Sequence, residues 1–191
     1  ENLGNFQFAI HPLPLEAQVA PVFGIQVGDY NQDSYPDLLL VGNSYATEVR
    51  TGRYDAFTGL CLLGDGAGSF KVIPSAQSGF WSTGDAKALT TRTLTDGRPL
   101  HLVAQNNGEL LGYESVLEQS DLIIPWQPGD AFTILEFANG RQEKREYYLG
   151  SGYLSQSSAY LRVPKAAVSV EITSAQGEMR VVSEGLSSLE K

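Results

Sequence analysis

The sequence has a single cysteine, a single methionine and only two histidines. Cys61 has no partner for an intrachain disulfide and lies in the apolar run Leu60–Leu63, so we expect a small core residue rather than a reactive thiol. His11 and His101 are too few and too far apart to supply the three or four nitrogen or sulfur ligands of a typical zinc site. We interpret His101, which lies in an apolar strand, as structural.

Positive charge is scarce, and long apolar runs are missing. The 13 Lys and Arg residues stand against 22 Asp and Glu residues, which gives a net charge of −9. We expect no nucleic-acid partner, because phosphates are bound by a basic surface. A membrane-spanning helix needs about 18 or more consecutive apolar residues, and none of that length occurs, so we predict no membrane span in this segment.

What the chain does contain is 20 glycines and nine prolines, spread as punctuation between short apolar runs. Asp-Gly and Asn-Gly pairs, which suit tight hairpin turns with positive φ, occur at 65–66, 96–97, 107–108 and 139–140. No convincing amphipathic helix is present. The pattern predicts an all-β chain of sequentially paired antiparallel strands at Phe6–Ile10, Phe23–Val27, Leu38–Val41, Leu60–Leu63, Phe70–Ile73, Leu100–Ala104, Phe132–Phe137 and Val168–Ile172.

A weak internal repeat shapes the domain prediction. Phe23–Asn43 aligns with Asp85–Asn106, and both segments run strand, polar turn, proline, apolar strand, asparagine. Units of about four strands have the size of β-propeller blades. The pattern changes after Glu114, and we place a boundary near residue 127. We therefore predict a partial β-propeller of about two four-stranded blades (1–126), a small antiparallel β domain (127–185) and a tail (186–191).

Two patterns mark the second domain. Val168, Val170 and Ile172 alternate with polar residues, which predicts a strand with one face on the core and one in solvent. Basic and acidic side chains alternate over residues 141–146, on the second arm of a predicted hairpin. We interpret that alternation as a solvent-exposed face.

Oxygen-bearing side chains gather in the segment 29–37, between two predicted strands. They fall at its first, third, fifth and ninth positions, and Tyr35 offers its backbone carbonyl. Ca²⁺ takes about six to eight oxygen ligands in flexible geometry. Carboxylates this close would repel one another without a cation. The segment therefore predicts a calcium site with the ligands Asp29, Asn31, Asp33, Tyr35 and Asp37.

This segment has two other interpretations. An EF-hand loop needs glycine at its sixth position, glutamate at its twelfth and flanking helices, whereas this chain has Ser34 and Leu40 there, between strands. An Asx-rich turn without metal, in which the side chains cap their own backbone, remains the alternative to calcium.

The surroundings of this loop carry a family resemblance. Phe23-Gly24, the loop 29–37, the strand Leu38–Val41 with Gly42-Asn43, and the turn Gly64–Phe70 resemble the FG-GAP/VCBS repeat, a calcium-loop propeller blade also found in integrin α chains. The resemblance implies a propeller blade that binds Ca²⁺. That family usually has glycine at the sixth loop position, where this chain has Ser34. The second copy has only Asp96 in its turn, so we predict no calcium there.

The segment Gly150–Ser158 is similar to the signature of the ASPIC/UnbV domain, which follows FG-GAP repeats in cartilage-acidic-protein-like and related bacterial secreted proteins. The resemblance implies an extracellular or cell-surface location, with upstream propeller blades in the same full-length chain. The signature is rich in serine and glycine. We expect a structured turn whose hydroxyls satisfy its own backbone, with presentation of backbone groups to a ligand as the alternative.

Together these patterns predict a non-catalytic, calcium-stabilised interaction or adhesion module whose partner is a protein or a glycan at the cell surface. We expect no enzymatic activity, since no Gly-x-Ser-x-Gly nucleophile elbow is present. The alternative function is a glycan-binding accessory domain that uses Trp81, Tyr45 and Tyr54. Aromatic side chains of this kind also serve in core or blade-to-blade packing, which is the competing interpretation of all three.

Overall fold

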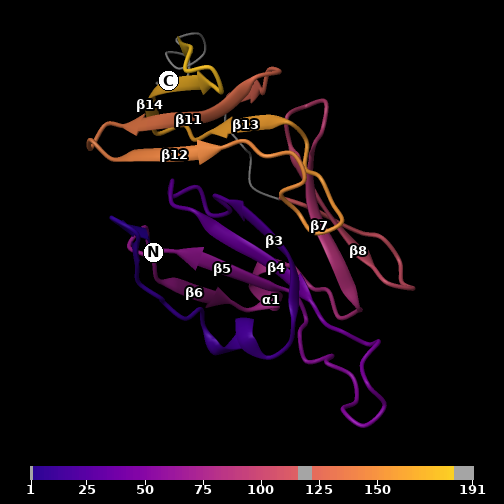
Figure 1. Ribbon diagram of the computed structural model, residues 1–191. Coiled ribbons are helices and arrows are strands. Elements are labelled where there is room, and N and C mark those ends of the chain that lie inside the picture. The colour runs from indigo at the N-terminus through magenta and orange to yellow at the C-terminus, as the bar shows by residue number, and fades with distance from the viewer. Residues whose placement is uncertain (1, 116–121, 183–191) are drawn as a thin grey trace.

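The computed structural model describes residues 2–115 and 122–182, and these form an all-β fold of several antiparallel sheets (Figure 1). The only helices in the described ranges are two single turns, η1 (Leu15–Gln18) and α1 (Ser75–Ser78). No helix in these ranges is long and apolar enough to cross a membrane. The predicted tail, 186–191, lies outside the described residues.

The first large sheet has the order β3-β4-β5-β6, with each strand antiparallel to its neighbour in sequence. Its interior strand β4 is the most buried, because a strand with neighbours on both edges and packing on both faces meets little water. The Asp65-Gly66 turn joins the last two strands, with Gly66 at φ 72°. The strands are β3 (Val22–Gly28), β4 (Asp37–Gly42), β5 (Leu60–Gly64) and β6 (Phe70–Ile73).

The second sheet has three strands in the described residues, β7 (Ala86–Thr93), β8 (Pro99–Gln105) and β9 (Leu111–Glu114). We expected four strands here. The next strand along the chain, β10 (Leu122–Pro125), pairs instead with β13 (Tyr160–Val163). The predicted turns at 96–97 and 107–108 do join paired strands, and Gly97 and Asn107 have φ of 86° and 54°.

The first two sheets share a core through a close contact between β3, β4 and β7. Val41, Leu89 and Val103 are almost completely buried within it. Gly24 makes this contact possible, because a Cβ atom at that position would lie 2.6 Å from Leu89 Cβ and 2.8 Å from Leu89 N. Backbones can approach this closely only where one residue has no side chain.

A second core lies in the C-terminal part, between the two-stranded sheet β10-β13 and the four-stranded sheet β12-β11-β14-β15. It includes Ile124, so residues on the N-terminal side of position 127 contribute to it. Leu135 and Val170 lie at its centre with no exposed surface. The strands of the larger sheet are β11 (Asp130–Phe137), β12 (Gln142–Glu146), β14 (Ala167–Ser174) and β15 (Met179–Val181).

The alternation predicted for β14 is only partly correct. Val170 and Ile172 are buried as expected, but Val168 is 53% exposed. The register between β11 and β14 shifts at this point, with Glu136 opposite Ser169 and Phe137 opposite Ala167. The shift leaves Val168 as the extra residue of a bulge, so its neighbour Ala167 takes the buried position.

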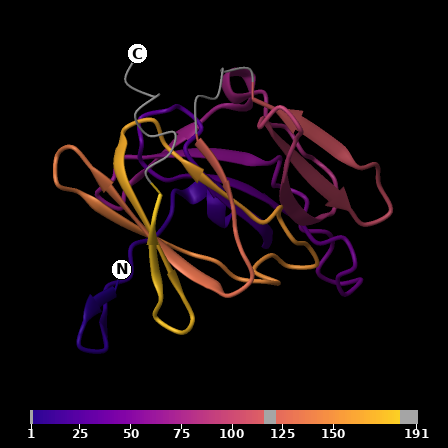
Figure 2. The same ribbon diagram turned by 90° about the horizontal axis from the view of Figure 1, so that it is seen from above.

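The N-terminal hairpin projects away from the rest of the molecule (Figure 2). It consists of β1 (Asn2–Gly4) and β2 (Gln7–Phe8), so the strand predicted over Phe6–Ile10 is shorter than expected. Phe6 and Ile10 are almost fully exposed. An isolated two-stranded hairpin buries little apolar surface and has little stability of its own.

Candidate functional site

The predicted calcium loop connects two hydrogen-bonded strands. β3 ends at Gly28 and β4 begins at Asp37, and these two residues are paired across the sheet. Between them the chain turns sharply, with left-handed φ at Gln32 (64°) and Ser34 (69°). Ser34 therefore holds a conformation that glycine adopts with least strain, at the position where the FG-GAP/VCBS family usually has glycine.

Three of the predicted ligands lie together inside this turn. Asp29 accepts hydrogen bonds from the backbone amides of Asp33 (3.1 Å) and Ser34 (2.8 Å). Asp33 accepts one from the backbone amide of Tyr35 (2.8 Å) and one from the side-chain amide of Asn31 (2.7 Å). Asn31 Oδ1 also accepts from the Asp33 amide (3.1 Å), so the side chains of Asp29, Asn31 and Asp33 each hold the backbone of the loop through its amides.

Asp37 ties the loop to the sheet. Its side chain is completely buried, and its two carboxylate oxygens accept hydrogen bonds from the backbone amides of Tyr30 (2.7 Å) and Gly64 (2.9 Å). It thereby joins the start of the loop to β5. The Tyr35 ring packs over Gly66, where a Cβ atom would lie 2.3 Å from the ring.

The surroundings of the loop disfavour the ionised form of two of its carboxyl groups. Burial raises the pKa of the Asp29 and Asp37 carboxyl groups, and the negative charge of Asp33 raises both further, while hydrogen bonds from backbone amides act in the opposite direction. Among the described residues, no Lys or Arg forms an ion pair with any of the three carboxylates. The loop is a set of hard oxygen donors whose carboxylates have no ion-pair partner in the described part of the chain.

The loop does not have the geometry of a finished metal centre. Within residues 2–115 and 122–182, no group of three or more His, Cys, Asp or Glu side chains is arranged to hold a metal ion. The donor chemistry suits a hard cation, but the carboxylate oxygens are engaged by the backbone amides described above. The calcium site and its ligand set stay a prediction.

Arg141 connects the loop to the C-terminal part of the molecule. Its Nη2 donates a hydrogen bond to the Ser34 carbonyl oxygen (2.6 Å), and its guanidinium lies over the rings of Phe137 (3.7 Å) and Tyr35 (5.0 Å). Nη1 pairs with Glu143 at 3.3 Å. The prediction that residues 141–146 form only a solvated face is wrong at Arg141, because this end of the hairpin meets the loop 29–37, which is distant in the sequence.

The Ser-rich segment 155–158 contacts the outer edge of β7 rather than itself. Ser158 N donates to Thr91 O (2.9 Å), and the Ser157 and Ser158 hydroxyls accept hydrogen bonds from Thr91 N (3.1 Å) and Thr93 N (3.2 Å). The Ser155 hydroxyl donates to Leu89 O (3.3 Å). We expected these hydroxyls to satisfy their own backbone, and that expectation is wrong. They cover an edge strand whose peptide groups would otherwise lack partners.

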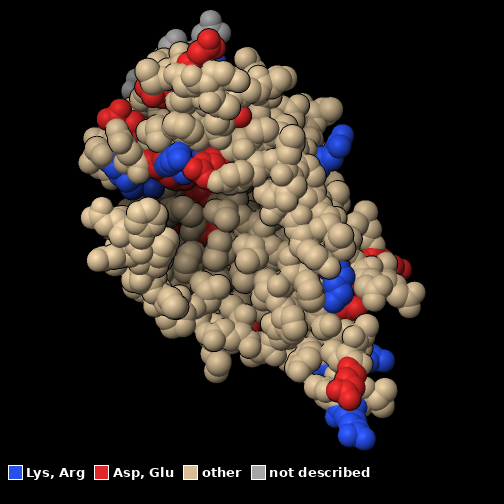
Figure 3. All heavy atoms as spheres, viewed as in Figure 1, with Lys and Arg blue, Asp and Glu red and all other residues tan. Residues whose placement is uncertain are grey.

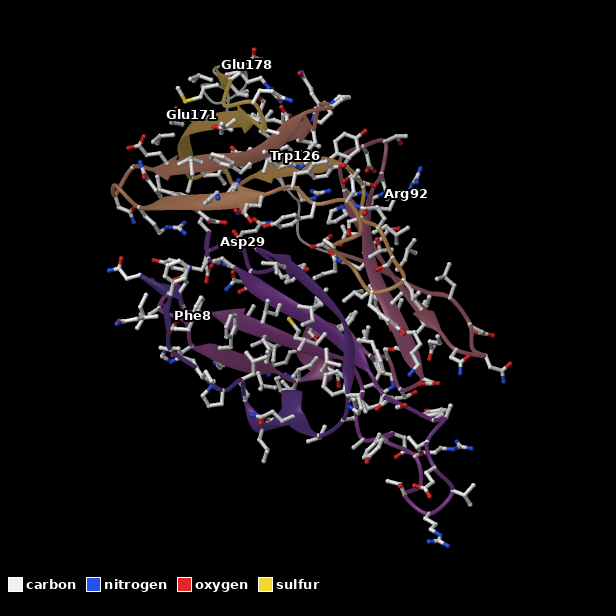
Figure 4. The ribbon with its side chains drawn as sticks, in the orientation of Figure 1. Phe8, Asp29, Arg92, Trp126, Glu171 and Glu178 are labelled. Carbon is white, nitrogen blue, oxygen red and sulfur yellow. The ribbon has the colours of Figure 1, made fainter. Side chains whose placement is uncertain are left out.

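A cleft of about 500 Å³ lies where the first two sheets meet the C-terminal part. Asp29 and Tyr30 line it on one side, Thr91 and His101 on the second, and strands β12 and β13 on the third. Figure 3 shows the surface hollowed beneath a group of Lys, Arg, Asp and Glu side chains. In Figure 4, Asp29 and Trp126 lie on opposite sides of this junction. Sequence reasoning did not find this cleft, because its walls come from segments far apart in the chain.

The three aromatic residues predicted to bind a glycan lie elsewhere. Trp81 is 53% exposed and Tyr54 is 44% exposed. The Tyr45 hydroxyl donates to Thr83 O (2.9 Å), and the Arg53 guanidinium lies 4.9 Å from the centre of its ring. Within the described residues no ring-to-ring contact joins the three.

Comparison with known proteins names no relative. No protein-family model matches the chain, and no curated protein matches it either.

Proposed function

We propose that this chain is a non-catalytic interaction module built from two propeller-type blade units, stabilised by Ca²⁺ in the loop 29–37. The observation that carries the proposal is the group of three acidic side chains, Asp29, Asp33 and Asp37, whose negative charges repel one another. Burial raises the pKa of the Asp29 and Asp37 carboxyl groups, and the charge of Asp33 raises both further. A bound divalent cation would remove that repulsion and fix the corner between β3 and β4.

The blade interpretation rests on the arrangement of the first two sheets. Each begins with a hairpin of long strands, β3-β4 and β7-β8, and the two hairpins pack together through Gly24 and Leu89. Consecutive antiparallel sheets packed face to face are the building principle of propellers. The FG-GAP/VCBS and ASPIC/UnbV resemblances add the proposal of a secreted or cell-surface chain with further blades upstream.

The alternative, glycan binding by Trp81, Tyr45 and Tyr54, has less support. Exposure of Trp81 favours it, but Arg53 occupies the face of Tyr45, and the three rings form no common platform in the described residues. The calcium-stabilised module is the function that the geometry supports best.

The calcium prediction is tested by thermal unfolding with Ca²⁺ and with chelator. Calcium at ten times its dissociation constant stabilises the folded state by about 1.4 kcal/mol and raises the melting temperature. Asp33→Asn should abolish this response, because asparagine keeps an oxygen for the Tyr35 amide but loses the charge.

The matched control is Asp65→Asn. Asp65 also caps a turn of the first sheet, accepting from Ala67 N (2.8 Å) and Ser69 N (3.0 Å), but lies outside the loop 29–37. This variant should keep the full calcium response. If the unmodified protein melts at the same temperature with and without chelator, the loop is a metal-free Asx turn and the proposal is wrong.

A further inference from the structure

The charged side chains that strand β12 contributes to the cleft are already paired. Glu143 pairs with Arg145 (2.6 Å) and with Arg141 (3.3 Å), and Lys144 pairs with Glu146 (2.5 Å). Arg145 also donates to the backbone carbonyl of Arg162. Groups paired in this way offer little net attraction to an anion or a cation, because binding either would first require breaking an existing pair.

Uncharged polar groups form the second wall of the cleft. Gln26 Nε2 donates to Leu89 O (3.1 Å), which leaves Gln26 Oε1 as an acceptor. The Thr91 hydroxyl donates its single proton to that oxygen (3.1 Å), so it acts as an acceptor toward His101 Nδ1, 2.9 Å away. This series of hydrogen bonds favours the tautomer with the imidazole proton on Nδ1 and a lone pair on Nε2.

His101 Nε2 is a buried acceptor without a hydrogen-bond partner among the described residues. The His101 side chain belongs to the cleft lining, and the residue is only 6% exposed. Burial, assisted by the charge of Arg162, lowers the pKa of His101 to about 4, so the ring is neutral at physiological pH. An unsatisfied buried acceptor costs about 1–3 kcal/mol, a cost that a ligand hydroxyl donating to Nε2 would remove.

Aromatic side chains also line the cleft. Trp126 lines the cleft with its ring stacked on Tyr147, at a centroid distance of 5.1 Å and an interplanar angle of 16°. Tyr160, also in the lining, is 44% exposed. Aromatic rings that line a polar cavity present an apolar face beside hydrogen-bonding groups.

We propose that this cleft binds a neutral saccharide. A sugar combines hydroxyl donors, which suit His101 Nε2, with C–H faces that suit Tyr160 and Trp126, and it carries no charge to compete with the paired side chains. The volume of about 500 Å³ lies within the range of small-molecule sites, about 300–1,000 Å³. The site is separate from Trp81, Tyr45 and Tyr54, and it goes beyond the calcium-stabilised module proposed above.

The experiment screens the protein, with Ca²⁺ present, on an array of neutral, sialylated and sulfated glycans, and then titrates the strongest neutral glycan by calorimetry. Tyr160→Ala and His101→Phe should each weaken binding about tenfold or more, since each removes one contact worth about 1.4 kcal/mol. Trp81→Ala, which removes an exposed ring outside the cleft, should leave the affinity unchanged.

Three results would overturn the proposal: no neutral glycan binds, only anionic glycans bind, or Trp81→Ala abolishes binding that Tyr160→Ala leaves intact. Circular dichroism checks the fold of each variant. If His101→Phe does not fold, the Tyr160→Ala variant alone tests the proposal, because Tyr160 pairs with Pro125 through its backbone and the residue is 44% exposed. Glycan binding and the chelator response are separate measurements, so either proposal can fail without the other.

Discussion

Ser34 has a left-handed backbone conformation (φ 69°) in the turn of the loop 29–37, and its amide and its carbonyl each form a hydrogen bond there. Its amide donates to Asp29 and its carbonyl accepts from Arg141. The position therefore sets the path of the loop and its attachment to the C-terminal part. Left-handed backbone costs a residue with a Cβ atom about 1–2 kcal/mol, so this attachment is maintained against local strain.

Ser34→Gly should stabilise the protein by about 0.5–1 kcal/mol. Glycine relieves the left-handed strain and keeps both backbone hydrogen bonds, while the greater freedom of the unfolded chain offsets part of the gain. Denaturant unfolding measures the change. Ser34→Val, which puts a β-branched residue at the same φ, should shift stability in the opposite direction. Equal stabilities for the two variants would show that the backbone there is not strained.

At the scale of elements, the contact between β3 and β7 holds the first two sheets together. Gly24 permits it, and the same pair of strands is bridged by Gln26, which donates to Leu89 O. The outer edge of β7 is then covered by the segment 155–158. β7, a strand of the second sheet, thus contacts both the first sheet and the C-terminal part. Its position therefore determines the shape of the cleft beside His101.

Gly24→Ala should destabilise the protein by about 1–3 kcal/mol, because the added methyl group would overlap Leu89 and Val41 and force the sheets apart. Gly112→Ala is the matched control. Gly112 also lies within a strand, but a Cβ atom there would meet its nearest neighbour at an ordinary 3.5 Å. Midpoints of chemical unfolding compare the two. If Gly24→Ala leaves the unfolding midpoint unchanged, β3 and β7 are too far apart for the added methyl group to overlap Leu89.

At the scale of the whole molecule, the serines of segment 155–158 and Arg141 join the C-terminal part to the first two sheets. Ser157 is central, since its hydroxyl contacts Thr91 N, Thr90 Oγ1 and Gln26 Oε1. Arg162 adds a hydrogen bond to Gly97 O (2.7 Å). Contacts of this number make cooperative unfolding of the two parts the expected behaviour.

Ser157→Ala should lower the free energy of unfolding by about 1–3 kcal/mol, because it leaves the Thr91 amide without its partner at the sheet edge. Calorimetry should also show the C-terminal part beginning to melt separately. Ser151→Ala is the control: this exposed serine lies in the same serine-rich stretch, 150–158, but outside the segment 155–158, and its loss should change stability by less than about 0.5 kcal/mol. A Ser157→Ala variant as stable as this control would mean that the contact between the segment 155–158 and β7 contributes nothing to the free energy of unfolding.

Local chemistry explains what could be predicted. The Asp-Gly and Asn-Gly pairs at 65–66, 96–97, 107–108 and 139–140 all join paired strands, because turn geometry depends on residues next to one another. The first four-stranded sheet and the all-β class follow from the same short-range signals. Asp29, Asn31 and Asp33 likewise converge because the turn that brings them together spans only a few residues.

Contacts between distant segments cannot be predicted from local patterns of this kind. No local pattern connects β10 with β13, or Ser157 with Thr91. The same holds for His101 Nε2, which has no partner within residues 2–115 and 122–182 because of how the surrounding strands pack. Alternation and turn residues indicate that a strand edge or a polar group exists, but its partner depends on how whole sheets pack. For that reason the sequence led to the loop 29–37, whereas the cleft depends on the packing of four sheets around it.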